Sequence, residues 1–306
     1  MADDDVDVVV VAVTWNSAGV IGGLLDSLAD AMLELSWHVV IVDNASSDGT
    51  PEIGKGLSPE ATVIQLGRNA GYAAGINAGL KAAAPRRAFV VVNPDVRFDE
   101  GCISTLVEEL SDESIGIAVP SVRDADGQRS FSLHRDATVR RALGDALLGG
   151  GRAGRFEALG EAVTRPDRYL TSRDVDWASG AVMALSPACV GEVGAWDESF
   201  WLYSEETDYC LRAREAGYRV RYVADARVVH LGGDLPRDPQ LWSTMTVNRV
   251  RLYGRRHGRL NTAAFHAAVM INEALRSVSG RGTSRTALAA LARPISSVSP
   301  GPVAGR

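Results

Sequence analysis

The stretch Phe89-Val-Val-Val-Asn-Pro-Asp95 is a short, branched apolar run that stops at a carboxylate, and His38-Val-Val-Ile-Val-Asp43 has the same design further upstream. Such runs are typical of buried parallel strands in an open α/β sheet, whose carboxyl ends meet at the crevice where ligands bind. We therefore expect Asp43 and Asp95 to face one pocket. A nucleotide site is the first hypothesis, with Asp43 accepting from a base or ribose and Asp95 meeting a metal ion. The alternative is that each acid only ends its strand or caps a helix.

The segments around these two runs alternate between strand-like and helix-like patterns. Apolar spacing of three and four residues predicts a helix capped by Ser17 that buries Val20, Ile21, Leu24, Leu28, Met32 and Leu35. Further helices are predicted from Pro51, over 72–83 and over 99–110, and strands over 6–13, 38–42, 62–66, 89–93 and 115–119. This alternation indicates an α/β fold with a mostly parallel sheet, right-handed crossovers and helices on both faces.

The alternation of strand-like and helix-like segments ends after Pro120. The segment Asp124-Ala-Asp-Gly-Gln128 predicts a hairpin turn between two short strands, and residues 136–170 predict a loop with some helix. Beyond these we expect a helix capped by Ser204 and ended by Gly217, with strands at 175–177, 181–185, 218–223 and 227–230. The pattern is helical beyond residue 240 and loses its period from Ser277, so the last residues, about thirty, are expected to be poorly ordered.

Composition narrows the class of protein. With 306 residues and 46% hydrophobic content, the chain can bury one large core or two modest ones, which excludes a disordered protein. The three cysteines lie far apart, so neither a zinc knuckle nor a disulfide framework is expected. An acidic N-terminus and the lack of an apolar run of about eighteen residues argue against a signal peptide and a membrane span. We therefore expect a cytoplasmic protein.

Sequence motifs exclude some nucleotide-dependent enzymes. Gly19, Gly22 and Gly23 lack the spacing of a dinucleotide-binding fingerprint, which argues against a dehydrogenase. The sequence has neither a phosphate-binding Gly-Lys-Ser/Thr loop nor a serine in a nucleophile elbow.

The net charge of −6 hides an asymmetry. After Pro236, eleven arginines oppose only Asp238 and Glu273, so a tail of net +9 follows a body of net −15. Such a tail could meet anionic lipid, a diphosphate or nucleic acid, because all three attract it by the same Coulomb force. The alternative is a solvated helical surface that uses arginine.

Two further segments carry polar groups suited to chemistry. Glu205, Glu206 and Asp208 crowd the first turn of a predicted helix, where acids favour the positive end of the helix dipole. The aromatic run before them supplies an apolar wall that raises the pKa of a carboxylate, which makes Glu206 a candidate general base. His230 ends a strand before two glycines, a place where histidine ligates a metal or hydrogen-bonds a phosphate, although a structural histidine is the more common case.

Taken in order, these segments resemble the family 2 glycosyltransferases of the GT-A fold, especially their bacterial rhamnosyltransferase-like branch. The resemblance runs from about Val8 to Gly233. Its landmarks are Val13-Thr-Trp-Asn16, Val42-Asp-Asn44 with Ser47-Asp-Gly-Thr50, Arg68-Asn-Ala-Gly-Tyr-Ala-Ala-Gly-Ile-Asn77, Asn93-Pro-Asp95, Trp177-Ala-Ser-Gly180, Glu205-Glu-Thr-Asp208 with Arg212, and His230. It implies a GT-A, Rossmann-like catalytic domain over 1–235 and a basic helical extension over 236–306.

The resemblance implies where a nucleotide-sugar donor would bind. Asp43 would accept from the imide N–H of a uracil or thymine, with Thr14 and Asn16 beside the base. The remaining donor-pocket positions would be Arg68, Asn69, Asn77 and Asn93.

The resemblance also implies a divalent cation, Mg²⁺ or Mn²⁺, at the donor diphosphate. Asp95 occupies the last position of the family's Asp-x-Asp metal motif, and His230 matches a histidine that reaches the metal or the diphosphate. Because Asn93 stands where many relatives have the first Asp, the metal should bind more weakly here.

Glu206 matches the catalytic base of the family. It would deprotonate an acceptor hydroxyl, which attacks the anomeric carbon as the nucleoside diphosphate leaves, in one inverting step. The acceptor side would include Trp177, Gly180, Glu205 and Asp208. Overall resemblance favours dTDP-rhamnose as the donor. The alternatives are a UDP-sugar donor carrying GlcNAc, galactose or glucose, a nucleotidyltransferase, and a non-catalytic nucleotide-sugar-binding module.

The sequence carries fewer signals for the acceptor than for the donor. The segment from Asn248 to Gly258 resembles the basic segment that follows the catalytic core in relatives acting on polyprenyl-diphosphate-linked sugars. This implies a cell-envelope glycan or lipid-linked acceptor, with peripheral contact at the inner face of an anionic cell membrane. No nucleic-acid partner is expected, and homo-oligomerisation is left open.

Overall fold

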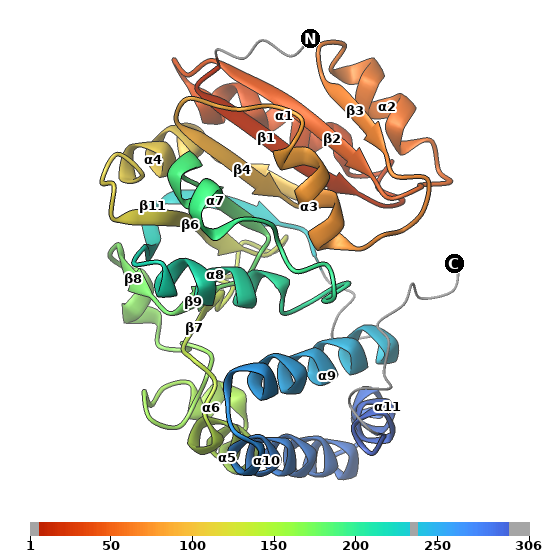
Figure 1. Cartoon of the computed structure of the whole chain (residues 1–306), viewed down its shortest axis with the longest axis vertical. Coiled ribbons are helices and arrows are strands. Elements are labelled where there is room, and N and C mark those ends of the chain that lie inside the picture. The colour runs from red at the N-terminus through yellow and green to blue at the C-terminus, as the bar shows by residue number, and fades with distance from the viewer. Residues whose placement is uncertain (1–5, 233–237, 294–306) are drawn as a thin grey trace.

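The computed structural model describes residues 6–232 and 238–293. Within these residues a nine-stranded sheet has the order β3-β2-β1-β4-β10-β6-β11-β5, with β8 paired to β11 outside this path (Figure 1). The strands are β1 (Val8–Thr14), β2 (Trp37–Asp43), β3 (Thr62–Gln65), β4 (Ala88–Val92), β5 (Val96–Phe98), β6 (Ile115–Arg123), β8 (Arg173–Val175), β10 (Val182–Leu185) and β11 (Arg219–His230). A small second sheet pairs β7 (Leu133–His134) with β9 (Trp177–Ala178).

The sheet is mostly parallel, as the alternating sequence pattern predicts. β1 runs parallel to β2 and β4, β2 runs parallel to β3, and β6 runs parallel to β11. β10 is antiparallel to β4 and β6, and β5 and β8 are antiparallel to β11.

The strand β1 explains why helices cover both faces. All of its residues are buried, and successive side chains of a strand point to opposite faces. Val8 and Val10 join the core beneath α1 (Ile21–Met32) and α4 (Cys102–Glu109). Val9 and Val11 join the opposite core, beneath α3 (Tyr72–Leu80), α7 (Pro187–Val193) and α8 (Glu205–Glu215). The short helix α2 (Thr50–Leu57) packs beside α1.

A third core lies among the helices at the bottom of Figure 1. It joins α5 (Val139–Leu148) to α9 (Pro239–Arg256), α10 (Arg259–Val278) and α11 (Gly282–Leu291), around Tyr253, Phe265 and Leu291. The connecting α6 (Gly150–Ala153) and the 3-10 helix η1 (Pro166–Tyr169) follow α5. Residues 139–148 thus pack with the C-terminal helices. The domain boundary expected from the sequence, between residues 235 and 236, assigns them instead to the catalytic domain. That boundary itself lies outside the described residues.

The two helix caps predicted from the sequence, Ser17 and Ser204, make no side-chain capping hydrogen bond. α1 begins at Ile21, and the Ser17 hydroxyl accepts from the Trp15 N–H at 3.2 Å instead of capping the helix. Ile21, Leu24, Leu28 and Met32 are buried as predicted. Ser204 does precede α8, but its φ is 78° and its side chain makes no capping hydrogen bond.

Three other predictions change in detail. The two last strands form one strand, β11, with a register shift between Val223 and Arg227. The predicted hairpin retains its turn, but only an isolated bridge joins Arg123 to Arg129. The helix α11 falls where the sequence predicts poor order, because burial of Ala287 and Leu291 supplies support that the local pattern lacks. No helix within the described ranges is long and apolar enough to cross a membrane.

Candidate active site

A large cavity lies where the carboxyl ends of β1 and β4 meet α8 and α9. Its volume is about 2260 Å³, whereas common ligand pockets hold roughly 300–1,000 Å³. The cavity therefore has room for two ligands side by side. Predicted positions on its wall are Thr14, Asn16, Asn69, Asn93, Asp95, Trp177, Gly180, Glu205, Glu206 and His230.

Asp43 lies behind this wall. It is 1% exposed at the end of β2. Its Oδ1 accepts from the hydroxyls of Thr14 at 2.9 Å and Ser46 at 2.5 Å, and its Oδ2 accepts from the Ser46 N–H at 2.8 Å. Both carboxylate oxygens are thus engaged within the protein. Asp43 orients Thr14 through this hydrogen bond. Of the two residues, only Thr14 lies on the cavity wall.

The other predicted donor residues divide into two groups. Asn16 and Asn69 lie on the wall, and Asn16 is held by a hydrogen bond from the Ser47 N–H to its Oδ1 at 2.9 Å. Asn77 is 5% exposed and binds the backbone of Trp196, donating to its carbonyl at 3.0 Å and accepting from its N–H at 2.8 Å. It fastens α3 to a neighbouring loop instead of lining the pocket. Arg68 is exposed and lies outside the wall.

Asp95 and His230 form a pair on the wall. His230 Nε2 lies 3.2 Å from Asp95 Oδ1, and the Gly232 N–H donates to Asp95 Oδ2 at 2.8 Å. Asn93 Nδ2 is 3.4 Å from the same His230 nitrogen. Burial opposes ionisation of Asp95, but the hydrogen bond and charge of His230 outweigh it, so the pKa of this carboxyl falls below its usual range.

Asp95 and His230 together fit a hard divalent cation that is held largely by the phosphates of a bound substrate. Mg²⁺ is usually bound through one or two carboxylates together with substrate phosphates. Asp95 offers a carboxylate that is ionised at neutral pH, and His230 offers a ring nitrogen beside it. Among the described residues no three His, Cys, Asp or Glu side chains converge on one point, so the protein alone supplies few ligands.

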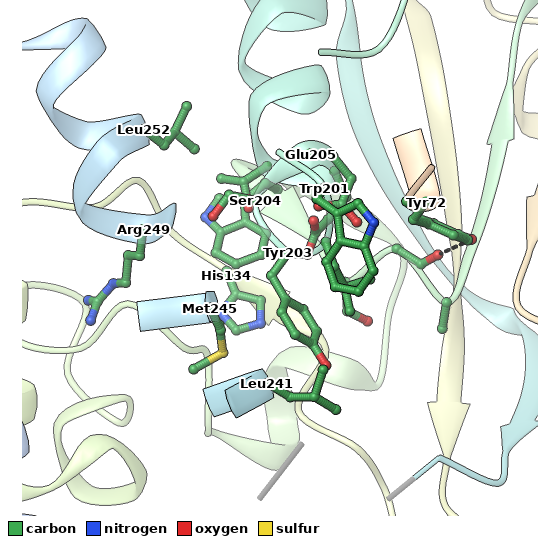
Figure 2. Close-up of a pocket in the computed structure, with 18 of the residues that line it drawn as sticks. Tyr72, His134, Trp201, Tyr203, Ser204, Glu205, Leu241, Met245, Arg249 and Leu252 are labelled. Carbon is green, nitrogen blue, oxygen red and sulfur yellow. Dashed lines mark hydrogen bonds between the residues drawn. The ribbon is translucent and has the colours of Figure 1, made fainter. Parts of the chain in front are cut away.

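Glu205 and Glu206 begin α8 and line the cavity. Figure 2 shows Glu205 beside Trp201 and Tyr203. Burial raises the pKa of both carboxyls, and the charge of Glu206 raises that of Glu205 further. The Oε2 atom of each is buried without a hydrogen-bond partner among the described residues. Two buried acids that line a cavity, with raised pKa values and an unsatisfied oxygen each, are candidates for proton transfer with a ligand.

The turn before α8 is strained, and α9 holds it. Tyr203 and Ser204 have φ of 66° and 78°, a region that costs about 1–3 kcal/mol per residue without glycine. Asn248 of α9 is 1% exposed and donates to the carbonyls of Leu202 at 2.9 Å and Tyr203 at 3.2 Å. Sequence reasoning missed Asn248, because nothing in the local pattern of α9 indicates the loop that it touches.

A close approach fixes the other side of the same loop. Gly71 has φ of 92°, and a Cβ at this position would lie 2.2 Å from the carbonyl oxygen of Trp201. The Tyr72 N–H donates to that carbonyl at 2.9 Å, and the Tyr72 hydroxyl donates to the Gly180 carbonyl at 3.2 Å (Figure 2). Glycine is therefore required where α3 meets the loop that carries the glutamates.

The predicted acceptor-side residues are partly brought together. Trp177 stacks on His134 with ring centroids 4.0 Å apart, and both line the cavity. Sequence reasoning missed His134, whose burial lowers its pKa to about 3. Gly180 lies beside Glu206, since a Cβ there would be 3.1 Å from the Glu206 Cβ. Asp208 instead binds Arg212 Nε at 2.7 Å and is absent from the wall.

The basic segment from Asn248 to Gly258 is committed to contacts inside the protein. Arg249 pairs with Glu161 and lies 3.6 Å from Asp145. Arg255 pairs with Asp197, and Arg256 pairs with Glu215. The Arg251 side chain donates to the Asn248 Oδ1 at 3.0 Å. Its predicted availability to a phosphate or a lipid is thus reduced, because each arginine already has a partner.

Residues 9–169 match the model of the family described as Glycosyl transferase family 2. Over 235 residues the chain is 30% identical to the N-acetylglucosaminyl-diphospho-decaprenol L-rhamnosyltransferase of Mycobacterium tuberculosis, which covers 72% of this chain and 75% of that protein. Two solved structures have a similar fold. The mannosyltransferase PcManGT from Pyrobaculum calidifontis, in complex with GDP-Man and Mn²⁺, has a TM-score of 0.56 and 18% identity, covering 94% of this chain and 75% of that chain. GalNAc-T7 with UDP, GalNAc and Mn²⁺ has a TM-score of 0.57 and 15% identity, covering 81% and 47%.

Proposed function

Since the chain belongs to glycosyl transferase family 2 and has the GT-A fold, we propose that it moves a sugar, with inversion, from a nucleoside diphosphate to a hydroxyl of a lipid-linked glycan. The donor that we propose is dTDP-rhamnose. The name of the mycobacterial relative, an N-acetylglucosaminyl-diphospho-decaprenol L-rhamnosyltransferase, supports rhamnose as the sugar and a lipid-linked acceptor.

One observation carries the proposal. The Asp95–His230 pair and the Glu205–Glu206 pair come from separate elements, yet all four side chains line one cavity. The first pair suits a diphosphate with its cation, and the second suits the removal of a proton. A glycosyl transfer needs both at one anomeric carbon, the leaving group on one face and the base on the other.

The proposed reaction is a single displacement. The acceptor oxygen forms a bond to the anomeric carbon while the bond from that carbon to the diphosphate oxygen breaks, and its electron pair leaves with the nucleoside diphosphate. Glu206, which lines the cavity, takes the proton of the acceptor hydroxyl on its carboxylate. Its raised pKa makes it a stronger base than an ordinary glutamate, although it must first be ionised.

At the leaving group, Asp95 and His230 are the residues that we propose to hold a Mg²⁺ or Mn²⁺ ion. When bound, such an ion offsets the negative charge that grows on the departing diphosphate. Asn93, which is neutral, adds no charge to this pair, so the ion should depend on the diphosphate for much of its affinity.

For the nucleotide base we propose Thr14 and Asn16 on the cavity wall, with Asp43 acting through Thr14. A direct bond from Asp43 to the imide N–H would use Oδ2, which accepts one hydrogen bond, from the Ser46 N–H. In either case loss of Asp43 should weaken binding of the nucleotide.

The test is a transfer assay with purified protein and a synthetic short-chain prenyl-diphosphate-linked sugar, with products detected by mass spectrometry. Donors are dTDP-rhamnose, UDP-GlcNAc, UDP-galactose and UDP-glucose, each with and without Mn²⁺. Product from dTDP-rhamnose alone supports the proposal. Product from a UDP-sugar alone keeps the transferase and replaces the donor. Binding of donors without any product would point to a nucleotide-sugar-binding module.

A further inference from the structure

The segment from α5 to the residues just after α6 exposes both apolar and basic side chains. We define the α5–α6 patch as Arg140, Leu143, Leu147, Leu148, Arg152, Arg155 and Phe156, all of them exposed. Leu147 is 73% exposed and Phe156 is 57% exposed. Residues 140, 143 and 147 follow helical spacing, so they share one side of α5. Single exposed leucines are ordinary, but four exposed apolar side chains and three exposed arginines within residues 140–156 indicate an interaction surface.

The backbone beneath the patch is tightly built. A Cβ at Gly144 would lie 2.1 Å from the Leu159 carbonyl, so the chain after α6 crosses directly against α5. The buried Arg135 donates through Nη1 to the carbonyls of Gly160 at 2.9 Å and Ala162 at 3.2 Å. Because the backbone of α5 is packed in this way, its exposed leucines are held in their outward positions.

The arginines of the patch are available to a partner. Within the described residues, the side chains of Arg140, Arg152 and Arg155 make no hydrogen bond or ion pair, unlike the arginines of α9. Glu157 is the exposed acid beside them. The patch thus combines positive charge with apolar side chains that can enter a headgroup layer, as surface-lying amphipathic helices do.

We propose that the α5–α6 patch binds the surface of an anionic lipid bilayer. Positive charge selects an anionic partner, and exposed leucine and phenylalanine select one with an accessible apolar layer. A second copy of the chain fits less well, because a two-fold contact through this patch would bring two positively charged surfaces together.

The position of α5 relates the patch to the cavity. Thr138 and Asp145, on the other side of this segment, line the cavity. An α-helix is about 10 Å across, so the proposed membrane contact lies roughly one helix away from the cavity wall. Binding would bring the cavity close to an acceptor whose lipid remains in the bilayer, a consequence that rests on the proposed function. The membrane contact does not rest on it.

The experiment is vesicle co-sedimentation of the full chain without any substrate. Vesicles of phosphatidylcholine mixed with phosphatidylglycerol are compared with vesicles of phosphatidylcholine alone, at low and at high salt. We expect binding to the mixed vesicles that weakens as salt rises. The variants Leu147→Ser/Leu148→Ser and Arg152→Glu/Arg155→Glu should each weaken it by at least about tenfold. Matched controls are Leu57→Ser, an exposed leucine of α2, and Lys81→Glu/Arg87→Glu, which makes the same charge change elsewhere.

The outcomes separate the possible partners. Equal binding by the patch variants and the controls overturns the proposal. Failure of the intact chain to bind mixed vesicles overturns it as well, and a dimer that only the patch variants lose would assign the patch to a second copy. Transfer to a water-soluble short-chain acceptor is measured in parallel and should stay within about twofold for every variant that keeps its melting temperature. Loss of vesicle binding with transfer retained leaves the proposed function intact, whereas binding without transfer in the intact chain would count against the proposed function alone.

Discussion

Asn248 on α9 donates a hydrogen bond of 3.2 Å to the carbonyl of Tyr203, a residue with φ of 66°. Through this contact the C-terminal helices hold the turn from which Glu205 and Glu206 enter the cavity. The helical extension is therefore part of the site, and residues far from the sheet should affect the reaction.

Replacing Asn248 by alanine removes the donor to the half-buried carbonyls of Leu202 and Tyr203 and frees a strained turn. We expect the free energy of unfolding to fall by about 1–3 kcal/mol and kcat to fall by at least about tenfold. Donor affinity, measured by calorimetry, should change little, because Thr14 and Asp95 are untouched. Asn272→Ala on α10 is the matched control, and equal losses in the two variants would contradict a positioning role.

Gly71→Ala should be strongly destabilising, since the added Cβ would lie 2.2 Å from the Trp201 carbonyl oxygen at a φ of 92°. Urea unfolding should report a loss of about 3 kcal/mol. Gly67 also has a positive φ, 71°, but a Cβ there meets nothing within 4 Å. Gly67→Ala should therefore cost only about 1–2 kcal/mol. If both substitutions cost the same, the close approach at Gly71 is not what requires glycine.

The glutamate pair predicts a pH dependence with a definite sign. A carboxyl whose pKa is raised by folding stabilises the native state below its ordinary pKa, near 4.5, and that contribution is lost as pH rises through the folded pKa. Glu205→Gln should therefore stabilise the protein at neutral pH relative to the wild type, with the gain vanishing below about pH 4.5. The acid limb of kcat/KM should stay where it is, because Glu206 ionises before Glu205 and therefore beside a neutral side chain in both proteins. Unfolding curves and rate profiles across pH measure both quantities, and an acid limb that moves to lower pH would show that Glu205, not Glu206, is the first of the pair to ionise.

Asp95→Asn should weaken the response to Mn²⁺. The substitution removes the charged ligand of the Asp95–His230 pair, so the Mn²⁺ concentration for half-maximal activity should rise by at least about tenfold. Thermal stabilisation by a nucleoside diphosphate with Mn²⁺ should shrink in parallel. The exposed Asp99 serves as the control through Asp99→Asn. A wild-type response to Mn²⁺ in the Asp95 variant would place the ion elsewhere.

The sequence predicts most of this fold because its signals are local. The buried runs ending at Asp43 and Asp95 do form parallel neighbours of β1, and period-two burial in β1 supplies both cores. The place of Glu206 on the cavity wall with aromatic residues was likewise predictable, since the aromatics precede it in the chain, whereas its role as the base stays a prediction.

What the sequence could not supply depends on contacts between distant segments. Asp43 faces Thr14 and Ser46 because of where β1 and the loop after β2 meet, and strand-end position alone does not determine that direction. Asn248 reaches Tyr203 across 45 residues. The arginines of α9 look available in sequence, yet their acidic partners lie in α5, the 154–165 loop and α8.

The most direct measurement compares donor binding and turnover in Glu206→Gln. Gln keeps the size of the side chain but cannot take the proton of the acceptor, so calorimetry should report donor affinity within about threefold of wild type. Single-turnover transfer should fall by at least about a hundredfold. Turnover close to that of the wild type would contradict the assignment of this cavity as the active site for sugar transfer.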